Sequence, residues 1–362
     1  MKNKFYLFCL IIPVLFSACS TDLDVTGKYK ETMVVYGLLD QGKPKQYIKI
    51  NKAFLGQGSA LVMAQVKDSV QYTNALSVTI KRLSDGSLYN LSPDNSIPKD
   101  PGAFYGPDQA NAIYSFNTPL VPDGSTSNPN DSTNSILVSG SEYRLTIKNN
   151  ITGTEVSSQT VLVNDFAYTQ YVSSSTYTFY NASSPAFPFV PKWNSAKNGR
   201  LYQLTIRFNY FDSTATGNIP HHLDWVFPQQ TSQGLNGGES MGENFPGQEF
   251  FQFVGSQLNN DPSVQSSQTS VIRRIAGNVD LIVAVGSDDL NTFIDVSKPS
   301  TGIIQDKPEF SNITNGIGLF SSRYNKFPEG PAGSNSMSKP LSAASLIFLR
   351  TGSYTNNLKF IR

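Results

Sequence analysis

Cysteine, histidine and tryptophan are scarce in this sequence of 362 residues, which contains only two of each. The cysteines are Cys9 and Cys19, so the chain beyond them has no thiol that could form a disulfide bond or act as a nucleophile. The histidines, His221 and His222, are adjacent, and in a strand they would point to opposite faces. This excludes a histidine-rich zinc or iron site. Asp288, Asp289, Asp295 and Asp306 are oxygen ligands that could bind calcium, but their spacing does not match an EF-hand loop, so we predict no metal and no cofactor.

An excess of charge of one sign is also lacking, because 28 lysines and arginines stand against 27 acidic residues. A chain this close to neutrality has no basic surface for nucleic acid, so we exclude that partner. We also expect no P-loop and no nucleophile elbow of the G-x-S-x-G type that serine hydrolases use. Glu239, Glu243 and Glu249 would be the first carboxylates to examine in a hydrolase. Surface acids on a loop are the favoured interpretation, and we predict that the protein is not an enzyme.

The N-terminus has the order of an export signal. Lys2 and Lys4 precede an apolar run over residues 5–16, and Ser17-Ala18-Cys19 follows. The cysteine after two small residues resembles a bacterial lipobox. The resemblance implies that residues 1–18 are a signal peptide and that Cys19 becomes the first residue, modified with diacylglycerol and palmitate. Several acyl chains give a permanent membrane anchor, whereas one chain binds only marginally.

Residues 19–30 are polar and are predicted to be a tether. Asp22 and Asp24 resemble the surface-export signals of Bacteroidota lipoproteins, and a simple solvated tether is an equally good interpretation. We expect an outer-membrane protein, anchored by its lipid on the periplasmic face or at the cell surface. Loss of the leader would remove two lysines and no acid, leaving 26 basic and 27 acidic residues.

Residues 31–164 show the alternation of apolar and polar side chains that is typical of half-buried strands. In Leu76–Leu83, for example, Leu76, Val78 and Ile80 would share one face. Asp85-Gly86 then gives the strongest hairpin signal of the chain. We predict an immunoglobulin-like antiparallel β-sandwich. Its strands are expected at residues 32–39, 46–50, 76–83, 88–91, 112–116, 143–148 and 154–163, with an exposed excursion at 121–135.

Residues 165–362 are predicted to form a second β-rich domain with one or two short helices. The segment Val279–Val285 is almost entirely apolar, which indicates a central strand. Further strands are expected at residues 201–211, 223–227, 249–254, 317–321 and 346–349, and helices at 257–275 and 288–295. The whole chain is thus predicted to be mostly β.

Three blocks of sequence are specific enough to compare with a known family: Val34–Gly37, Tyr143–Ile147 and the closing segment S-N-I-x-N-G-x-G-x-F at 311–320. Together with the lipobox, they resemble an uncharacterised family of Bacteroidota outer-membrane lipoproteins that carries a domain of unknown function. The resemblance implies a β-sandwich-like front domain and an association with TonB-dependent outer-membrane transporters, and it transfers no catalytic residue. Gly316 and Gly318 are interpreted as fold positions, because glycine permits positive φ and close backbone approach.

Aromatic side chains in polar surroundings are the remaining candidates for a site. Exposed rings stack on sugars or anchor protein interfaces, whereas buried rings cover the edges of a core. We predict ligand binding by Tyr177, Tyr180, Trp193 and Trp225, with core packing as the alternative. The predicted function is a non-enzymatic accessory or binding lipoprotein that works with a TonB-dependent transporter. The alternatives are a carbohydrate-binding or adhesion module and, third, a carboxylate-dependent hydrolase.

Overall fold

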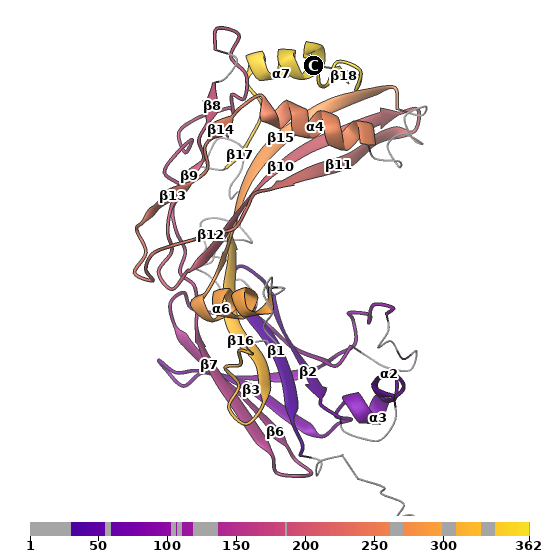
Figure 1. Cartoon of the computed structure of the whole chain (residues 1–362), viewed down its shortest axis with the longest axis vertical. Coiled ribbons are helices and arrows are strands. Elements are labelled where there is room, and N and C mark those ends of the chain that lie inside the picture. Colours follow the sequence, from indigo (N-terminus) through magenta and orange to yellow (C-terminus); the bar gives the residue numbers. More distant parts are fainter. Residues whose placement is uncertain are drawn as a thin grey trace, which may run out of the picture.

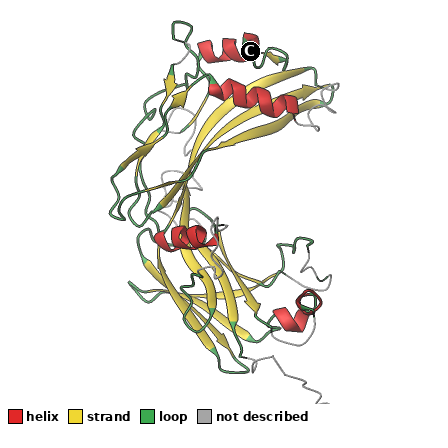
Figure 2. Ribbon diagram, in the orientation of Figure 1, coloured by secondary structure: helices red, strands yellow, loops and turns green. Residues whose placement is uncertain are grey.

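Strands dominate the computed structural model, as the sequence predicts, and helices are few (Figure 2). The two halves of the chain lie end to end and form a crescent (Figure 1). The structure describes residues 30–54, 59–102, 106, 111–118, 137–184, 187–260, 271–298, 309–326 and 337–361. The excursion predicted at 121–135 and the N-terminal leader and tether up to residue 29 lie outside these ranges.

The first half contains seven strands, each at a position that alternation predicts. The buried side chains of β6 are Tyr143, Leu145, Ile147 and Asn149, every second residue, as expected for a strand with one face on a core. Neighbours pair antiparallel in the order β1-β2-β5-β4-β3-β6-β7. The strands are β1 (Met33–Asp40), β2 (Lys45–Lys52), β3 (Leu76–Arg82), β4 (Leu88–Asp94), β5 (Ile113–Asn117), β6 (Glu142–Asn149) and β7 (Glu155–Val161), and two short helices follow β2, α2 (Ala60–Ala64) and α3 (Lys67–Val70).

One strand from the second half completes this sandwich. β16 (Ile317–Lys326) pairs parallel with β1, from Val34 opposite Ile317 to Asp40 opposite Arg323. Its last four residues pair antiparallel with β15 (Arg273–Gly286), a strand of the second half. The predicted division at residue 164 therefore assigns β16 to the second half, although its Phe320 is buried in the first core. The sandwich is antiparallel except for this one pair.

The closing segment of the sequence seals the sandwich at the point where β7 meets the chain before β16. Ser157 and Thr314 exchange backbone hydrogen bonds of 3.3 and 2.8 Å. The Asn312 side chain accepts from the Phe320 N–H at 2.9 Å, donates to the Phe320 carbonyl at 2.8 Å and donates to Asp289 at 2.9 Å. These contacts give the block a structural role, as its glycines indicate.

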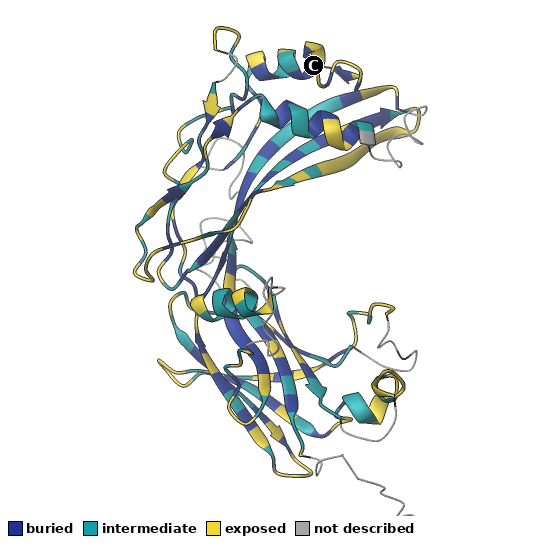
Figure 3. Ribbon diagram, viewed as in Figure 1, coloured by how far each residue is buried: buried dark blue, intermediate teal, exposed yellow. Residues whose placement is uncertain are grey.

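The second half is built on three long strands, which are β10 (Leu201–Thr214), β11 (Gly217–Val226) and β15. β15 lies between β10 and β16, so its prediction as a central strand is confirmed. β11 is the edge strand and is exposed along its length (Figure 3). The short strands are β8 (Pro188–Phe189), β9 (Lys192–Asn194), β12 (Gln230–Thr231), β13 (Ser240–Gly242), β14 (Phe245–Pro246), β17 (Ser338–Lys339) and β18 (Phe360–Ile361).

Two segments predicted as strands are helices. The residues 249–254 belong to α4 (Glu249–Asn260), where Phe250, Val254 and Leu258 recur at intervals of four and lie on one buried helix face. The residues 346–349 belong to α7 (Ala343–Thr351), which begins at the capping side chain of Ser342. Of the helix expected at 257–275, residues 257–260 form the end of α4 and residues 261–270 lie outside the described ranges, whereas its last residues are wrong because β15 begins at Arg273.

The helix predicted at 288–295 is confirmed as α6 (Asp288–Ser297), with two acids in its first turn. Within the described ranges no helix is long and apolar enough to cross a membrane. α6 packs on β16, whereas α4 and α7 lie on the second half, in the far arm of the crescent (Figure 1).

The close approach of β16 to β1 generates a stability prediction at Gly318. Its φ is +118°, and an added Cβ would overlap the carbonyl oxygen of Val35. Gly318→Ala should lower the free energy of unfolding by about 3 kcal/mol or more, since strain and overpacking add. The control is Gly153→Ala in the β6–β7 turn, where φ is +77° and no atom lies within 4 Å of the added Cβ.

Gly153→Ala should lower the free energy of unfolding by only about 1 kcal/mol, because the positive φ is the only source of strain for alanine at this position. Urea unfolding of both variants measures the difference. Equal losses in the two variants would contradict the tight β1–β16 contact.

Candidate ligand-binding face

Two of the four aromatic residues predicted to bind a ligand are in the core, which corrects that prediction. Tyr177 and Trp193 are 0% and 1% exposed. The Tyr177 hydroxyl donates to the Met337 carbonyl at 2.8 Å, and burial raises the pKa of this phenol well above its usual range. Neither ring has a face open to solvent, because the polar sequence around them folds over an aromatic cluster with Phe179 and Phe189.

The other two candidates, Tyr180 and Trp225, are half-buried and hold helices in place. The Tyr180 ring stacks on Phe348 of α7, with ring centroids 3.9 Å apart. The Trp225 ring stacks on Phe253 of α4, with centroids 5.4 Å apart and planes at 11°. Both contacts match the alternative interpretation, in which the rings cover the edges of the core.

The residues considered for hydrolysis do not form a catalytic group in the described structure. His221 stacks on Tyr210, whereas His222 lies 4.0 Å from Asp224, so the two imidazoles face opposite sides of β11 as predicted. Glu239 accepts a hydrogen bond from the Gln233 backbone N–H at 2.8 Å. Glu243 accepts instead from Gln230, and Glu249 begins α4.

A G-x-S-x-G sequence is nevertheless present at 238–242, which corrects the expectation that none exists. Its serine, Ser240, begins β13, which pairs with β9. A nucleophile elbow requires a sharp turn from a strand into a helix, so this segment does not form one. Among the described residues, no group of three or more histidine, cysteine, aspartate or glutamate side chains is arranged to hold a metal.

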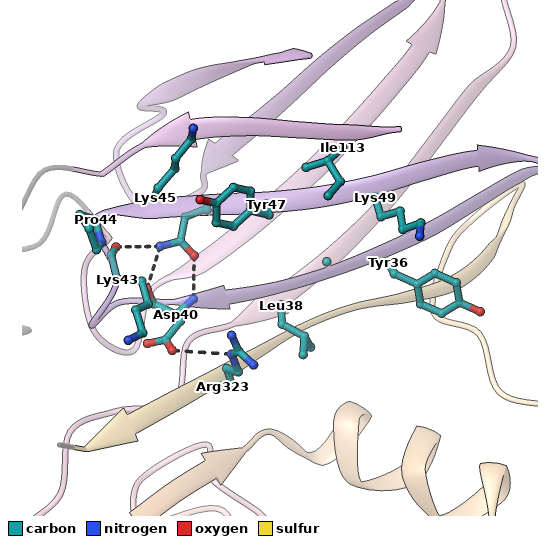
Figure 4. A pocket seen from close by; sticks show the side chains of 12 residues that line it. Tyr36, Leu38, Asp40, Lys43, Pro44, Lys45, Tyr47, Lys49, Ile113 and Arg323 are labelled. Atoms are coloured by element: carbon teal, nitrogen blue, oxygen red, sulfur yellow. Dashed lines mark hydrogen bonds and ion pairs between the residues drawn. The ribbon is translucent and has the colours of Figure 1, made fainter. Parts of the chain in front are cut away.

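The best candidate site is instead the outer face of the sandwich, over β1, β2, β5 and β16. The pleat turns every second side chain to this face. In the register, Tyr36 lies opposite Lys49, and Lys49 opposite Ile113. On the other side of β1, Asp40 lies opposite Arg323. Together these rows line an open depression of about 530 Å³, formed by Tyr36, Gly37, Leu38, Asp40, Lys43, Pro44, Lys45, Gln46, Tyr47, Lys49, Ile113 and Arg323 (Figure 4).

Two tyrosines present their rings to the depression. Tyr36 and Tyr47 are 44% and 38% exposed, whereas the inward residues of the same strands are buried. The edge of Tyr36 packs against Phe293 of α6, with centroids 6.0 Å apart. The ammonium of Lys45 lies 5.6 Å from the centroid of Tyr47. Each ring is thus held in place by a neighbour while part of it stays accessible.

Four cations line the same depression, and two acids neutralise part of their charge. The Lys45 ammonium lies 2.6 Å from Asp94 and holds the pKa of that carboxyl well below its usual range, together with hydrogen bonds from Ser96 and Ser115. Arg323 lies 3.6 Å from Asp40. Because four cations stand against two acids, the depression is positive overall. It attracts anions.

The rim of the depression is preorganised by one buried amide. The Gln46 side chain accepts from the Asp40 backbone N–H at 2.8 Å and donates to the Asp40 and Lys43 carbonyls at 2.7 and 3.0 Å. The Thr118 hydroxyl also donates to the Lys43 carbonyl, at 2.7 Å. These bonds satisfy the backbone of the β1–β2 turn and fix the positions from which its cations project.

Asp40 is the more deeply buried of the two acids. Burial raises the pKa of its carboxyl above the usual range, and Arg323, the Gly42 N–H and Lys43 oppose that shift without cancelling it. The carboxylate is only 2% exposed, whereas the side chain of Arg323 is 47% exposed. Protonation of Asp40 would therefore leave the arginine charge open to a ligand.

The sequence does contain a signal for this site. Lys45, Tyr47 and Lys49 occupy alternate positions of one strand, so two cations and an aromatic ring must share a face. Arg323 could not be added to them from sequence, because it comes from a strand almost 280 positions later, and the parallel pairing with β1 brings it there.

Comparisons with known proteins do not identify the chain. No protein-family model matches it, and neither does any curated protein. Among solved structures, one similarity is to the C-terminal globular domain of an oligosaccharyltransferase from Pyrococcus abyssi, at 9% identity and a TM-score of 0.24. It covers 70% of this chain and 46% of that one.

The raised pKa of Asp40 generates a pH prediction. An acid whose folded-state pKa is raised destabilises the protein above that pKa, and the penalty shrinks as pH falls through it. The wild-type chain should therefore gain stability relative to Asp40→Asn between pH 7 and pH 4, close to the ordinary pKa of an aspartate. Urea unfolding at both pH values measures this, and the difference between the two proteins cancels the effect of other carboxyls. A relative loss by the wild type would contradict the buried charge.

Proposed function

We propose that this protein is a lipid-anchored, non-enzymatic binding protein of the outer membrane, which captures an anionic ligand on the open face and works beside a TonB-dependent transporter. The observation that carries the proposal is the face itself, where two accessible tyrosines lie among four cations in one depression. The proposal names no reaction, and binding is its only activity.

The chemistry of the lining favours an anionic ligand. Lysine and arginine form short charge-assisted hydrogen bonds with carboxylates and phosphates. Arg323 can bind a carboxylate with two parallel bonds, whereas Lys49 acts as a point charge. The depression is open to solvent, which suits part of a larger, extended molecule better than a small enclosed ligand.

A carbohydrate is the second candidate, as the ligand of a binding or adhesion module. The specific observation for it is the pair Tyr36 and Tyr47, whose partly exposed rings can stack on the apolar faces of sugars. The two candidates converge in an acidic oligosaccharide, whose carboxylates would meet the cations while its rings contact the tyrosines.

The proposed anchor and the proposed transporter partner are both based on the sequence. The lipobox ending at Cys19 supports membrane attachment, and the resemblance to the outer-membrane lipoprotein family supports a transporter as partner. Anchoring confines the protein to a thin layer beside the transporter, which raises the effective concentration of captured ligand there.

The anchor is tested by Cys19→Ala in the full chain expressed with its own leader. Without the acceptor thiol no lipid can be added, so the protein should leave the membrane fraction and appear among the soluble proteins. Fractionation and immunoblotting measure its distribution, with the unmodified chain as control. Equal sedimentation of both forms with membranes would contradict lipid anchoring.

The ligand class is tested with oligogalacturonate and its methyl ester, two probes with the same sugar rings and different charge. The acid form should bind, and Lys49→Ala combined with Arg323→Ala should weaken that binding about tenfold or more, since each charged hydrogen bond contributes roughly 1.5–3 kcal/mol. The control is Lys148→Ala, which removes an exposed lysine from β6 outside this face. Calorimetric titration gives the affinities.

Tighter binding at higher salt, or equal binding of the acid and its methyl ester, would exclude the anionic ligand. Equal binding of the two probes that is lost in Tyr36→Ala and Tyr47→Ala would support the carbohydrate alternative instead.

A further inference from the structure

The point where the chain enters its first strand is fixed to the rest of the sandwich. The Glu31 carboxylate accepts hydrogen bonds from Asn149 at 2.7 Å, from Thr152 at 2.6 Å and from Thr154 at 2.8 Å. Burial alone would raise the pKa of this carboxyl, but the hydrogen bonds from Thr152, Asn149 and Thr154 outweigh it and the pKa is lowered. The tether therefore ends at a rigid place beside the β6–β7 turn.

Four exposed aliphatic side chains lie in the segments at this end of the sandwich, which are the β6–β7 turn, α2 and the residue between α2 and α3. Ile151, in the β6–β7 turn, is 80% exposed, and Val62 in α2 is 63% exposed. Val66, between α2 and α3, and Leu61 are 50% and 48% exposed. We call Leu61, Val62, Val66 and Ile151 the basal patch. Exposed aliphatics gathered at one end of a molecule are typical of an interaction site.

Contacts hold the helical part of the basal patch near the entry point. Lys52 donates to the Asp68 carbonyl of α3 at 3.4 Å, and Asn51 donates to the Val70 carbonyl at 3.3 Å. Glu31, Lys52, Asp68 and Ile151 line one shared depression. Figure 1 shows α2 and α3 at the lower end of the crescent, beside the strands of the first half.

We propose that the basal patch contacts the phospholipid surface of the membrane that holds the anchor. The inference rests on the proposed lipidation of Cys19, and it names a second contact that lipidation does not require. Lys30 lies eleven positions after Cys19, and a fully extended chain spans at most about 3.6 Å per residue. The entry point therefore stays within roughly 40 Å of the lipid surface.

Charge around the patch suits the same surface. Lys30 and Lys67 are exposed beside it, and their aliphatic stems can lie along the acyl boundary while the ammonium groups reach phosphates. The Glu31 carboxylate oxygens accept hydrogen bonds from hydroxyl and amide groups of the protein itself. A face with aliphatic side chains and flanking lysines is the composition that binds at membrane interfaces.

This contact would also orient the ligand-binding face. β1 runs from the base at Met33 to the rim of the depression at Asp40, seven residues further along. At about 3.3 Å per residue, Asp40 lies roughly 23 Å along β1 from Met33, whereas Tyr36 and its partner Lys49 lie only about 10 Å from the base. With the basal patch on the membrane, the Tyr36 end of the depression is therefore nearer the headgroups and the Asp40 end is farther from them.

The experiment uses single-cysteine labels, because the chain without its leader has no cysteine once Cys19 is replaced. The chain from residue 19, with Cys19→Ala and an N-terminal hexahistidine, is held on vesicles of phosphatidylethanolamine and phosphatidylglycerol that contain a nickel-chelating lipid. An environment-sensitive dye is attached through Val62→Cys or Ile151→Cys. The matched control is Ile347→Cys on α7, which is 55% exposed and lies on the far arm.

The labels at positions 62 and 151 should shift to shorter emission wavelength and be quenched by lipids spin-labelled near the headgroup, whereas the label at 347 should not change. Replacing Leu61 and Val66 with serine should weaken the quenching at 151 several-fold, with the circular dichroism spectrum unchanged. Signals at 62 and 151 equal to that at 347 would overturn the proposal.

A second outcome would also overturn it. Shielding of positions 62 and 151 in native outer membranes but not in protein-free vesicles would assign the basal patch to a protein partner. Failure of the lipid anchor itself is distinguishable, because the hexahistidine replaces the anchor here and the Cys19→Ala fractionation tests acylation separately.

Discussion

The parallel pairing of β16 with β1 is the constraint on which the rest of the molecule depends. This pairing adds a strand from the second half of the chain to the first sandwich and buries Phe320 in that core. The last four residues of the same strand pair with β15 of the second half. The same strand carries Arg323 to the ligand-binding face and Tyr324 to the second core. One strand therefore joins the two hydrophobic cores and completes the candidate site.

The joint between the halves is reinforced by side chains on both sides of it. The Ser322 hydroxyl donates to the Val161 carbonyl at 2.7 Å, and Lys326 lies 2.6 Å from Asp165. Phe166 packs edge-on against Tyr324, with ring centroids 6.2 Å apart. These contacts connect the end of the first sandwich directly to β16, which makes the crescent a continuous structure along this strand.

The sequence predicts most of the first half, because alternation with period two is a local property that Leu76, Val78 and Ile80 display without their partners. It fails at residues 249–254 and 346–349, where aromatic and aliphatic runs fit a strand or a helix equally well and tertiary packing decides. The candidate site was missed for a different reason. Trp193 and Tyr177 sit in polar sequence yet are buried, whereas Tyr36 and Tyr47 sit in good strands yet are exposed. The polarity of the residues on either side of an aromatic residue in the sequence does not predict whether its side chain is buried in the folded protein.

The central claim is that the outer face of β1, β2 and β16 binds an anionic ligand, and hydrogen exchange measured with and without an acidic oligosaccharide mixture tests it most directly. The account predicts slower exchange in the peptides that cover residues 36–49 and 317–326, while the segments around α4 and α7 stay unchanged. Protection around Trp225 and α4 with none at β1 and β2 would contradict it, because the ligand would then bind the far arm of the crescent.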